Sequence, residues 1–132
     1  MEKQFKEFIA YKGPCYTVEW YHDDRGRNEV LEYFNDLSVE RQRKFMVLIR
    51  RIGDAGKIFD KTKFRNEGDG IYAFKLHPDR FLCFFFSGRK IIITNAFEKK
   101  TDKLPMSEKQ KALIRQADFK RRIKEGTYYG RL

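Results

Sequence analysis

The sequence contains few of the residues on which disulfide-stabilised or metal-dependent proteins rely. Its 132 residues include only two cysteines, Cys15 and Cys83, and two histidines, His22 and His77, which stand alone. Two cysteines do not form a disulfide framework, and no group of Cys and His has the spacing of a metal site. We therefore expect a cytoplasmic protein with reduced cysteines and with no metal or other cofactor.

Long apolar runs are also missing. No stretch of about 18 apolar residues exists, so we expect no membrane-spanning segment and no membrane partner. The first residues, Met1 to Lys6, lack the continuous apolar segment of a secretory signal. Apolar residues still make up 41% of the chain and aromatic residues 16%, which suits one hydrophobic core and excludes disorder. We expect a single domain over residues 1–132, with 1–14 and 126–132 as loose tails.

Acidic residues are outnumbered by basic ones. The chain has 29 Lys and Arg against 19 Asp and Glu, a formal net charge of +10. Such an excess repels itself in the free protein and favours a polyanionic partner. A nucleic acid, an anionic membrane or an acidic protein could each supply the negative charge.

The N-terminal half predicts one strand followed by two helices. Residues 16–21 are rich in β-branched and aromatic side chains, as strands are. Asn28 or Asp24 is expected to cap a first helix, whose apolar side carries Val30, Leu31, Phe34 and Leu37. Ser38 is expected to cap a second helix that ends at Gly53 and Gly56. Its apolar stripe consists of Phe45, Leu48, Ile49 and Ile52.

The C-terminal half predicts three strands and a basic helix. The strands span 71–76, 80–86 and 90–97, and the middle one is apolar on both faces and hence central. A turn at 77–79 and a tight hairpin at Ser87-Gly88 connect them. Ser107 to Gln110 has a capping-box pattern that would open the last helix. The fold class is thus α+β: a small antiparallel sheet with two N-terminal helices and a basic C-terminal helix.

Basic residues gather around the predicted strands. Lys75 and Arg80 flank the first turn of the meander, and Lys99 and Lys100 follow its last strand. Further cations that we expect to hold an RNA backbone are Lys61, Lys63, Arg65, Lys103, Arg121 and Arg122. A single surface cation is usually only solvated, but so large an excess on one short domain favours a shared anion site.

Aromatic residues are interleaved with these cations. Stacking faces for unpaired bases could come from Phe64, Tyr72, Phe74, Phe81 and Phe97, although Phe in a strand more often belongs to the core. Tyr128 and Tyr129 lie near the end of the chain between glycines, and we expect them to be exposed.

If the polyanionic partner is an RNA that the protein cuts without a metal, the site must meet three chemical demands. The 2′-hydroxyl must be helped to attack the phosphate, the negative phosphorane must be stabilised, and the leaving 5′-oxygen must be protonated. His22 and His77 are candidates, although loop histidines more often face solvent. A cluster of Lys and Arg is the alternative, because close like charges lower a lysine pKa while arginine stabilises charge.

The meander and the segment after it resemble a known family. The run Gly70-Ile71-Tyr72-Ala73-Phe74-Lys75-Leu76, followed by Asp79-Arg80-Phe81-Leu82, is similar to the Gly-x-Tyr-x-x-basic and Tyr-Arg-Val-Leu signature of RelE-superfamily toxins. The segment from Asn95 to Pro105 is similar to the His-Gly-Phe-x-Lys-Lys-Thr-x-Lys-x-Pro stretch of the phage-derived, HigB-like branch. The similarity is specific over roughly residues 60 to 120.

The resemblance implies a toxin of a type II toxin–antitoxin module. Such a toxin enters the ribosomal A site, cuts the mRNA there as a metal-independent endoribonuclease, and is silenced by a small antitoxin, often a helix-turn-helix DNA-binding protein. Lys75 matches a strand residue that contributes to catalysis, and Arg80 matches the arginine that stabilises the scissile phosphate. Lys99 or Lys100 matches a basic position after the last strand.

Three positions depart from the family pattern. Ala73 stands where some relatives have a second strand lysine, and Asn95 stands where the branch often has His. The tyrosine that some relatives carry on the last helix has no counterpart near Met106, so Tyr128 or Tyr129 would have to replace it. Two alternatives therefore remain: a ParE-like toxin that poisons DNA gyrase on the same fold, and a non-catalytic nucleic-acid-binding module.

Overall fold

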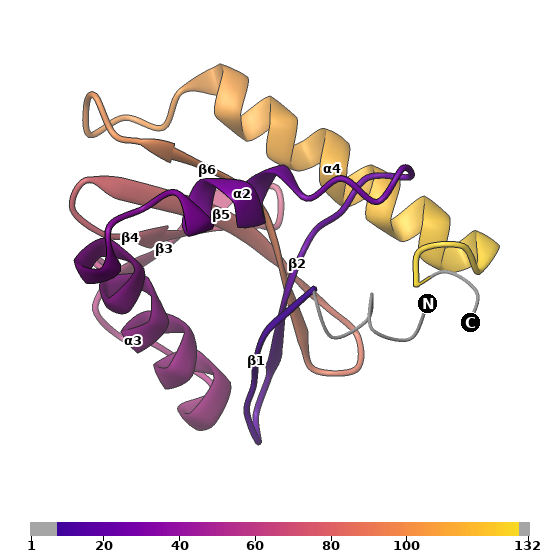
Figure 1. Cartoon of the computed structure of the whole chain (residues 1–132), viewed down its shortest axis with the longest axis horizontal. Coiled ribbons are helices and arrows are strands. Elements are labelled where there is room, and N and C mark those ends of the chain that lie inside the picture. Colours follow the sequence, from indigo (N-terminus) through magenta and orange to yellow (C-terminus); the bar gives the residue numbers. More distant parts are fainter. Residues whose placement is uncertain (1–7, 130–132) are drawn as a thin grey trace.

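A computed structural model describes residues 8–129 and has the predicted α+β class (Figure 1). Its elements are β1 (Ile9–Lys12), β2 (Thr17–Trp20), α2 (Glu29–Asn35), α3 (Val39–Ala55), β3 (Phe64–Gly68), β4 (Ile71–Lys75), β5 (Asp79–Phe86), β6 (Lys90–Glu98) and α4 (Met106–Glu125). They build a six-stranded sheet of order β1-β2-β6-β5-β4-β3. No helix in the described part of the chain is long and apolar enough to cross a membrane.

The sheet confirms the predicted meander and adds to it. Strands β4, β5 and β6 are antiparallel neighbours, and β5 and β6 lie at the centre. The expectation of a purely antiparallel sheet is wrong at one pair, because β2 runs parallel to β6 with Thr17 opposite Lys90 and Trp20 opposite Ile93. Arg65 belongs to the edge strand β3, which was not among the predicted strands.

Side-chain caps explain where α2 and α3 begin. The Asn28 side chain accepts a hydrogen bond from the Leu31 N–H (3.1 Å), and Ser38 Oγ accepts one from the Arg41 N–H (3.2 Å). Gly56 ends α3 in the left-handed conformation, with φ of 84°. Gly53, predicted to end this helix, instead lies inside it.

Gly53 is where the β1–β2 hairpin touches α3. Its carbonyl accepts the N–H groups of Cys15 (2.8 Å) and Tyr16 (3.1 Å). A Cβ at Gly53 would lie 2.7 Å from the ring of Tyr11, and one at Gly13 would lie 2.3 Å from the Gly53 oxygen. Glycine is therefore needed at both positions for this close approach.

The capping box predicted for the last helix is absent. Pro105 is the N-cap of α4 and makes no side-chain cap bond, and Ser107 lies within the helix. Glu108 turns to the sheet instead, where its carboxylate accepts a hydrogen bond from Nδ2 of the buried Asn95 (3.0 Å).

The sheet is covered on both faces, which explains the double-sided apolarity of β5. Phe81 and Cys83 face the core under α2 and α3, where the rings of Phe45 and Phe81 stack at 3.9 Å. Leu82 and Phe84 face the core under α4. Figure 1 shows α3 and α4 on opposite sides of the sheet.

Residues 126–129, the described part of the expected C-terminal tail, are not loose. Tyr128 is only 2% exposed and belongs to the core under α4, so the prediction that it is exposed is wrong. Tyr129 is half-buried, and its hydroxyl donates to Glu19 Oε1 (2.8 Å). Residues 9–12, within the other expected tail, form β1. The rest of these tails, 1–7 and 130–132, lies outside the described residues.

Candidate anion-binding cleft

A cleft of about 530 Å³ opens beside the β4–β5 turn, next to α3. Its cations come from α3 and from the segments around β4, β5 and β6: Lys44, Arg51, Lys63, Lys75, Arg80 and Lys99. The only carboxylate among its lining residues is Asp102. Six positive charges against one negative charge give the cleft a net positive charge, which favours anions.

Strand register brings the central cations together. Lys75 on β4 lies opposite Arg80 on β5, and Arg80 lies opposite Phe97 on β6. Directly opposed residues of antiparallel strands project from the same face, so Lys75 and Arg80 share one face of the sheet. Lys99 follows β6 and is held by its backbone N–H, which donates to the Pro78 carbonyl (2.8 Å).

Helix α3 adds two cations to the cleft. Lys44 and Arg51 are seven residues apart and therefore lie on one side of the helix. Val47 and Leu48, between them, line the apolar part of the same cleft. This pair was not among the cations predicted for the site. Its signal in the sequence is the seven-residue spacing next to the predicted apolar stripe.

The Arg80 side chain is anchored at the rim of the sheet. Its Nη1 donates to the carbonyls of Leu76 and of Asp79 (3.2 Å for the latter). Partial burial lowers the pKa of Arg80 from its ordinary value, although a guanidinium keeps its charge at any physiological pH. Both bonds come from Nη1, so the Nε and Nη2 donors stay available to a phosphate in the described structure.

Asp102 occupies the cleft as an internal anion. Its Oδ1 lies 2.9 Å from Lys99 Nζ. The hydrogen bond from Lys99 and the charges of Lys99, Lys75 and Arg80 hold the pKa of Asp102 below its usual range. The side chain of Asp102 is 95% exposed, so an incoming phosphate can displace it from Lys99 at little cost in packing.

A buried network supports the cleft from behind Arg80. Asp79 is 2% exposed and accepts hydrogen bonds from Arg41 Nε (2.8 Å), Arg41 Nη2 (2.6 Å) and the Tyr33 hydroxyl (2.6 Å). Burial raises the pKa of Asp79, but the bonds from Arg41 and Tyr33 outweigh it and the net pKa is lowered. Arg41 also contacts Glu98 (3.0 Å), so the network joins α2, α3, β5 and β6.

A family model covers most of this architecture. The model described as "Phage derived protein Gp49-like (DUF891)" matches residues 32–117, a range that contains every cation of the cleft. The chain belongs to the Gp49-like family. This family is associated with the toxins of toxin–antitoxin systems. No curated protein matches the chain.

The Gp49-like domain brings together part of the predicted site. Lys63, Lys75, Arg80 and Lys99 line the cleft, and Lys103 lines a small adjoining recess with Lys75 and Arg80. Of the two alternatives after the last strand, Lys99 lines the cleft and Lys100 does not. Lys61 and Arg65 are exposed but are not part of its lining. Arg121 lies on α4, where it pairs with Asp118 and Glu125.

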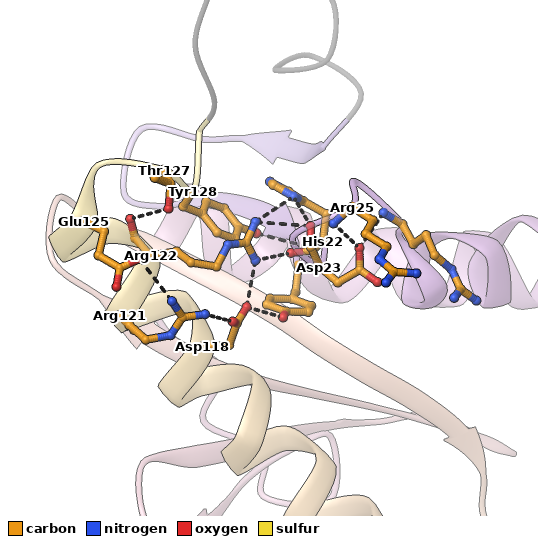
Figure 2. Close-up of polar contacts among 11 residues, drawn as sticks. His22, Asp23, Arg25, Asp118, Arg121, Arg122, Glu125, Thr127 and Tyr128 are labelled. Carbon is orange, nitrogen blue, oxygen red and sulfur yellow. Dashed lines mark hydrogen bonds and ion pairs between the residues drawn. The ribbon is translucent and has the colours of Figure 1, made fainter.

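Arg122, predicted to bind RNA, is 4% exposed and is not available to a nucleic acid. Figure 2 shows its guanidinium among residues of the loop after β2. It donates to Asp118 Oδ2 (2.7 Å) and to the carbonyls of His22 (2.9 Å) and Asp23 (3.2 Å). It also lies 4.6 Å from the centre of the Tyr128 ring. This arginine therefore fastens α4 to the loop after β2.

The two histidines have different surroundings. His22 is buried against the Tyr128 ring, with ring centres 4.1 Å apart, so the expectation that it faces solvent is wrong. Burial lowers the pKa of His22. His77 is exposed in the β4–β5 turn and lines the cleft.

The aromatic residues are mostly structural. Phe74 and Phe81 are fully buried and offer no face to a base. Phe64 and Tyr72 stack on one another at 5.3 Å, and both pack against the core under α3. Phe97 is half-buried and lines the recess beside Arg80, where it is the one aromatic side chain. Among the described residues, no group of three or more His, Cys, Asp or Glu could hold a metal ion.

Proposed function

We propose that the chain is the toxin of a type II toxin–antitoxin system and cuts mRNA on the ribosome without a metal. The observation that carries the proposal is the cleft itself, where six cations meet and Lys75 and Arg80 project side by side from one face of the sheet. Family membership supports the toxin class. The net charge of +10 supports a polyanionic target such as rRNA and mRNA.

The cleft can meet the three demands of RNA cleavage by transesterification. A base takes the proton of the 2′-hydroxyl, its oxygen bonds to phosphorus, and the bond to the 5′-oxygen breaks as that oxygen gains a proton. In this proposal Arg80 and Lys75 hold the non-bridging oxygens as their charge grows. Lys99, released from Asp102, and His77 are the candidates for proton transfer, because both line the cleft.

The proposed partners follow from the same class. The toxin would work in the ribosomal A site on translated mRNA and be silenced by a small antitoxin, expected to be a helix-turn-helix DNA-binding protein. A second candidate function is a gyrase-directed, ParE-like toxin. Ala73 favours it, because this side chain lines the recess beside Lys75 and Arg80 at a position where some relatives in the resembled family carry a second strand lysine.

The test is induced expression in a bacterium, followed by mapping of mRNA 5′ ends. Arg80→Ala is the test variant. Arg25→Ala is the matched control, because Arg25 is exposed in the loop after β2 and is not part of the cleft. We expect growth arrest with cuts inside translated frames for the wild type and for Arg25→Ala, and neither for Arg80→Ala. Growth arrest with intact mRNA would refute the RNase and favour the gyrase-directed toxin.

A third result would point to a protein that only binds nucleic acid. The purified chain would then bind RNA with a steep salt dependence, but expression would neither arrest growth nor cut mRNA. Equal folding of all variants is checked by the fluorescence of Trp20, the single tryptophan of the chain, which is 3% exposed.

A further inference from the structure

A second concave surface lies on the outer side of α3. This groove of about 520 Å³ is lined by Phe34 of α2 and by Val39, Gln42, Arg43, Met46, Val47 and Arg50 of α3. We call it the α3 groove. Two of its apolar side chains are unusually exposed for their type, Val39 at 65% and Val47 at 51%. Exposed valines that lie together over an open groove mark a surface that a partner covers.

The lining of the α3 groove has the pattern of a helix-binding face. Val39, Arg43, Met46, Val47 and Arg50 follow the spacing i, i+4, i+7, i+8, i+11, which is one stripe of an α-helix. The stripe is about 17 Å long at 1.5 Å per residue, so it matches a partner helix of about three turns. An amphipathic helix can lay its apolar side chains along such a stripe.

The charges of the α3 groove define the polar side of that helix. Arg43 and Arg50 carry the only charges among its lining residues, and both are exposed. Lys44 and Arg51, each the next residue along α3, point to the cationic cleft. Val47 lines both the groove and the cleft. Since Val47 borders both surfaces, a helix in the groove would lie next to the cleft. Acidic side chains of that helix would be attracted by Arg43 and Arg50 in the groove and by Lys44 and Arg51 in the cleft.

We propose that the α3 groove binds an acidic amphipathic helix of a protein partner. The apolar residues of this helix cover Val39, Met46 and Val47, and its carboxylates pair with Arg43 and Arg50. Further carboxylates of the helix reach Lys44 and Arg51 and thereby exclude RNA from the cleft. The inhibitory part rests on the proposed function, since it requires the cleft to be the RNA site, whereas the binding part does not.

The chemistry of the floor favours a protein over RNA as the occupant. Val39, Met46 and Val47 offer no hydrogen-bond donor to a phosphate or to a base edge. The amide of Gln42 already donates to the carbonyls of Phe34 (3.0 Å) and Asn35 (3.3 Å). Phe34 is the one aromatic ring in the groove, and it packs against Trp20 and Phe45 at 5.2 and 5.9 Å between ring centres. Apolar side chains gain free energy on such a floor, while nucleotides lose hydration.

The test uses a synthetic helical peptide of 14 residues with leucines at i, i+4, i+7 and i+11 and glutamates at the flanking positions. It is titrated into the full chain by calorimetry, and backbone amide shifts locate its site. We expect saturable binding with shifts concentrated over Val39–Arg50. Binding should weaken about tenfold or more with Val47→Asp and with Arg43→Glu, but stay unchanged with Arg25→Glu. A peptide with serines in place of the leucines should not bind.

Four results would overturn the proposal. Equal binding of the serine and leucine peptides would show attraction to net charge alone. Shifts outside Val39–Arg50 would place the peptide elsewhere. Shifts of these same amides by a 2′-O-methyl RNA that cannot be cleaved would assign the groove to RNA. Simultaneous binding of this RNA and the leucine peptide would refute closure of the cleft. Peptide binding needs no catalysis, so a failure to cut mRNA with intact, competitive peptide binding would count against the proposed function alone.

Discussion

Replacing Asp79 by alanine tests whether the buried network behind Arg80 stabilises the domain. Asp79 is 2% exposed and accepts two hydrogen bonds from Arg41 and one from Tyr33. Its removal leaves the Arg41 guanidinium and the Tyr33 hydroxyl without their main acceptor. Breaking a fully buried ion pair costs about 3–5 kcal/mol.

The expected cost is at the lower end of that range. Arg41 keeps its contact with Glu98 and its side chain is 29% exposed, so water can resolvate part of its charge. We therefore expect Asp79→Ala to lower the free energy of unfolding by about 3 kcal/mol. For a domain of this size that corresponds to a fall in Tm of roughly 10 °C.

Urea unfolding followed by Trp20 fluorescence measures this loss. Urea is preferred to guanidinium because it does not screen ion pairs. Asp54→Ala is the matched control, since Asp54 also accepts a tyrosine hydroxyl at 2.6 Å, from Tyr11, but is exposed. We expect it to cost about 0.5 kcal/mol.

A double-mutant cycle with Arg41→Ala completes the test. Because Arg41 and Asp79 make a two-pronged contact, we expect a coupling of about 2 kcal/mol. The reasoning fails if Asp79→Ala costs no more than Asp54→Ala, or if the coupling is below about 0.5 kcal/mol. The pKa of Asp79 is lowered in the fold, so its contribution is present above about pH 4 and disappears as the pH falls further.

Three further predictions concern the buried side chains. The pKa of His22 is lowered in the fold, so below about pH 6.5 the unfolded chain binds a proton that the folded chain excludes. Urea titrations should therefore show that the free energy of unfolding decreases as the pH falls below about 6.5, and that it decreases less steeply for His22→Gln. Equal slopes would contradict this. Tyr128→Ala should lower the free energy of unfolding by about 3–4 kcal/mol, because the ring is buried. Tyr128→Phe should lower it by about 1 kcal/mol, because it removes only the hydroxyl that accepts the His22 N–H (3.1 Å). A loss below about 1 kcal/mol for Tyr128→Ala would show that this segment does not pack on the core. Burial raises the pKa of the Cys83 thiol, so a thiol reagent should titrate only Cys15 in the folded protein and both after unfolding.

Local patterns in the sequence were sufficient for the meander and for the three helices, although not for the cap of α4. Asn28 and Ser38 cap helices where expected, because a side-chain oxygen next to a helical stripe is a strong local signal. Strand β3 gave no such signal. It is a mostly polar edge strand from Phe64 to Gly68, and it is held by pairing with β4 rather than by apolar alternation.

Contacts between distant segments could not be predicted from local patterns. The parallel pairing of β2 with β6 and the burial of Tyr128 against His22 each join residues from opposite ends of the chain. In the cleft, Lys75 and Arg80 were found because they flank one turn. Lys44 and Arg51 were not, because only the packing of α3 beside that turn brings them there.

The pairing of β2 with β6 has a consequence for synthesis of the protein. During synthesis β2 has only β1 beside it until β6 has been made. The loop after β2 is held by Arg122 and Tyr128, which follow later still. Pairing between distant segments slows folding because a long loop must close first. A nascent chain therefore cannot complete its sheet before β6, which ends at Glu98, has emerged. We expect chains that stop before α4 not to complete the fold, so under the proposed function no active toxin would form until α4 has been made.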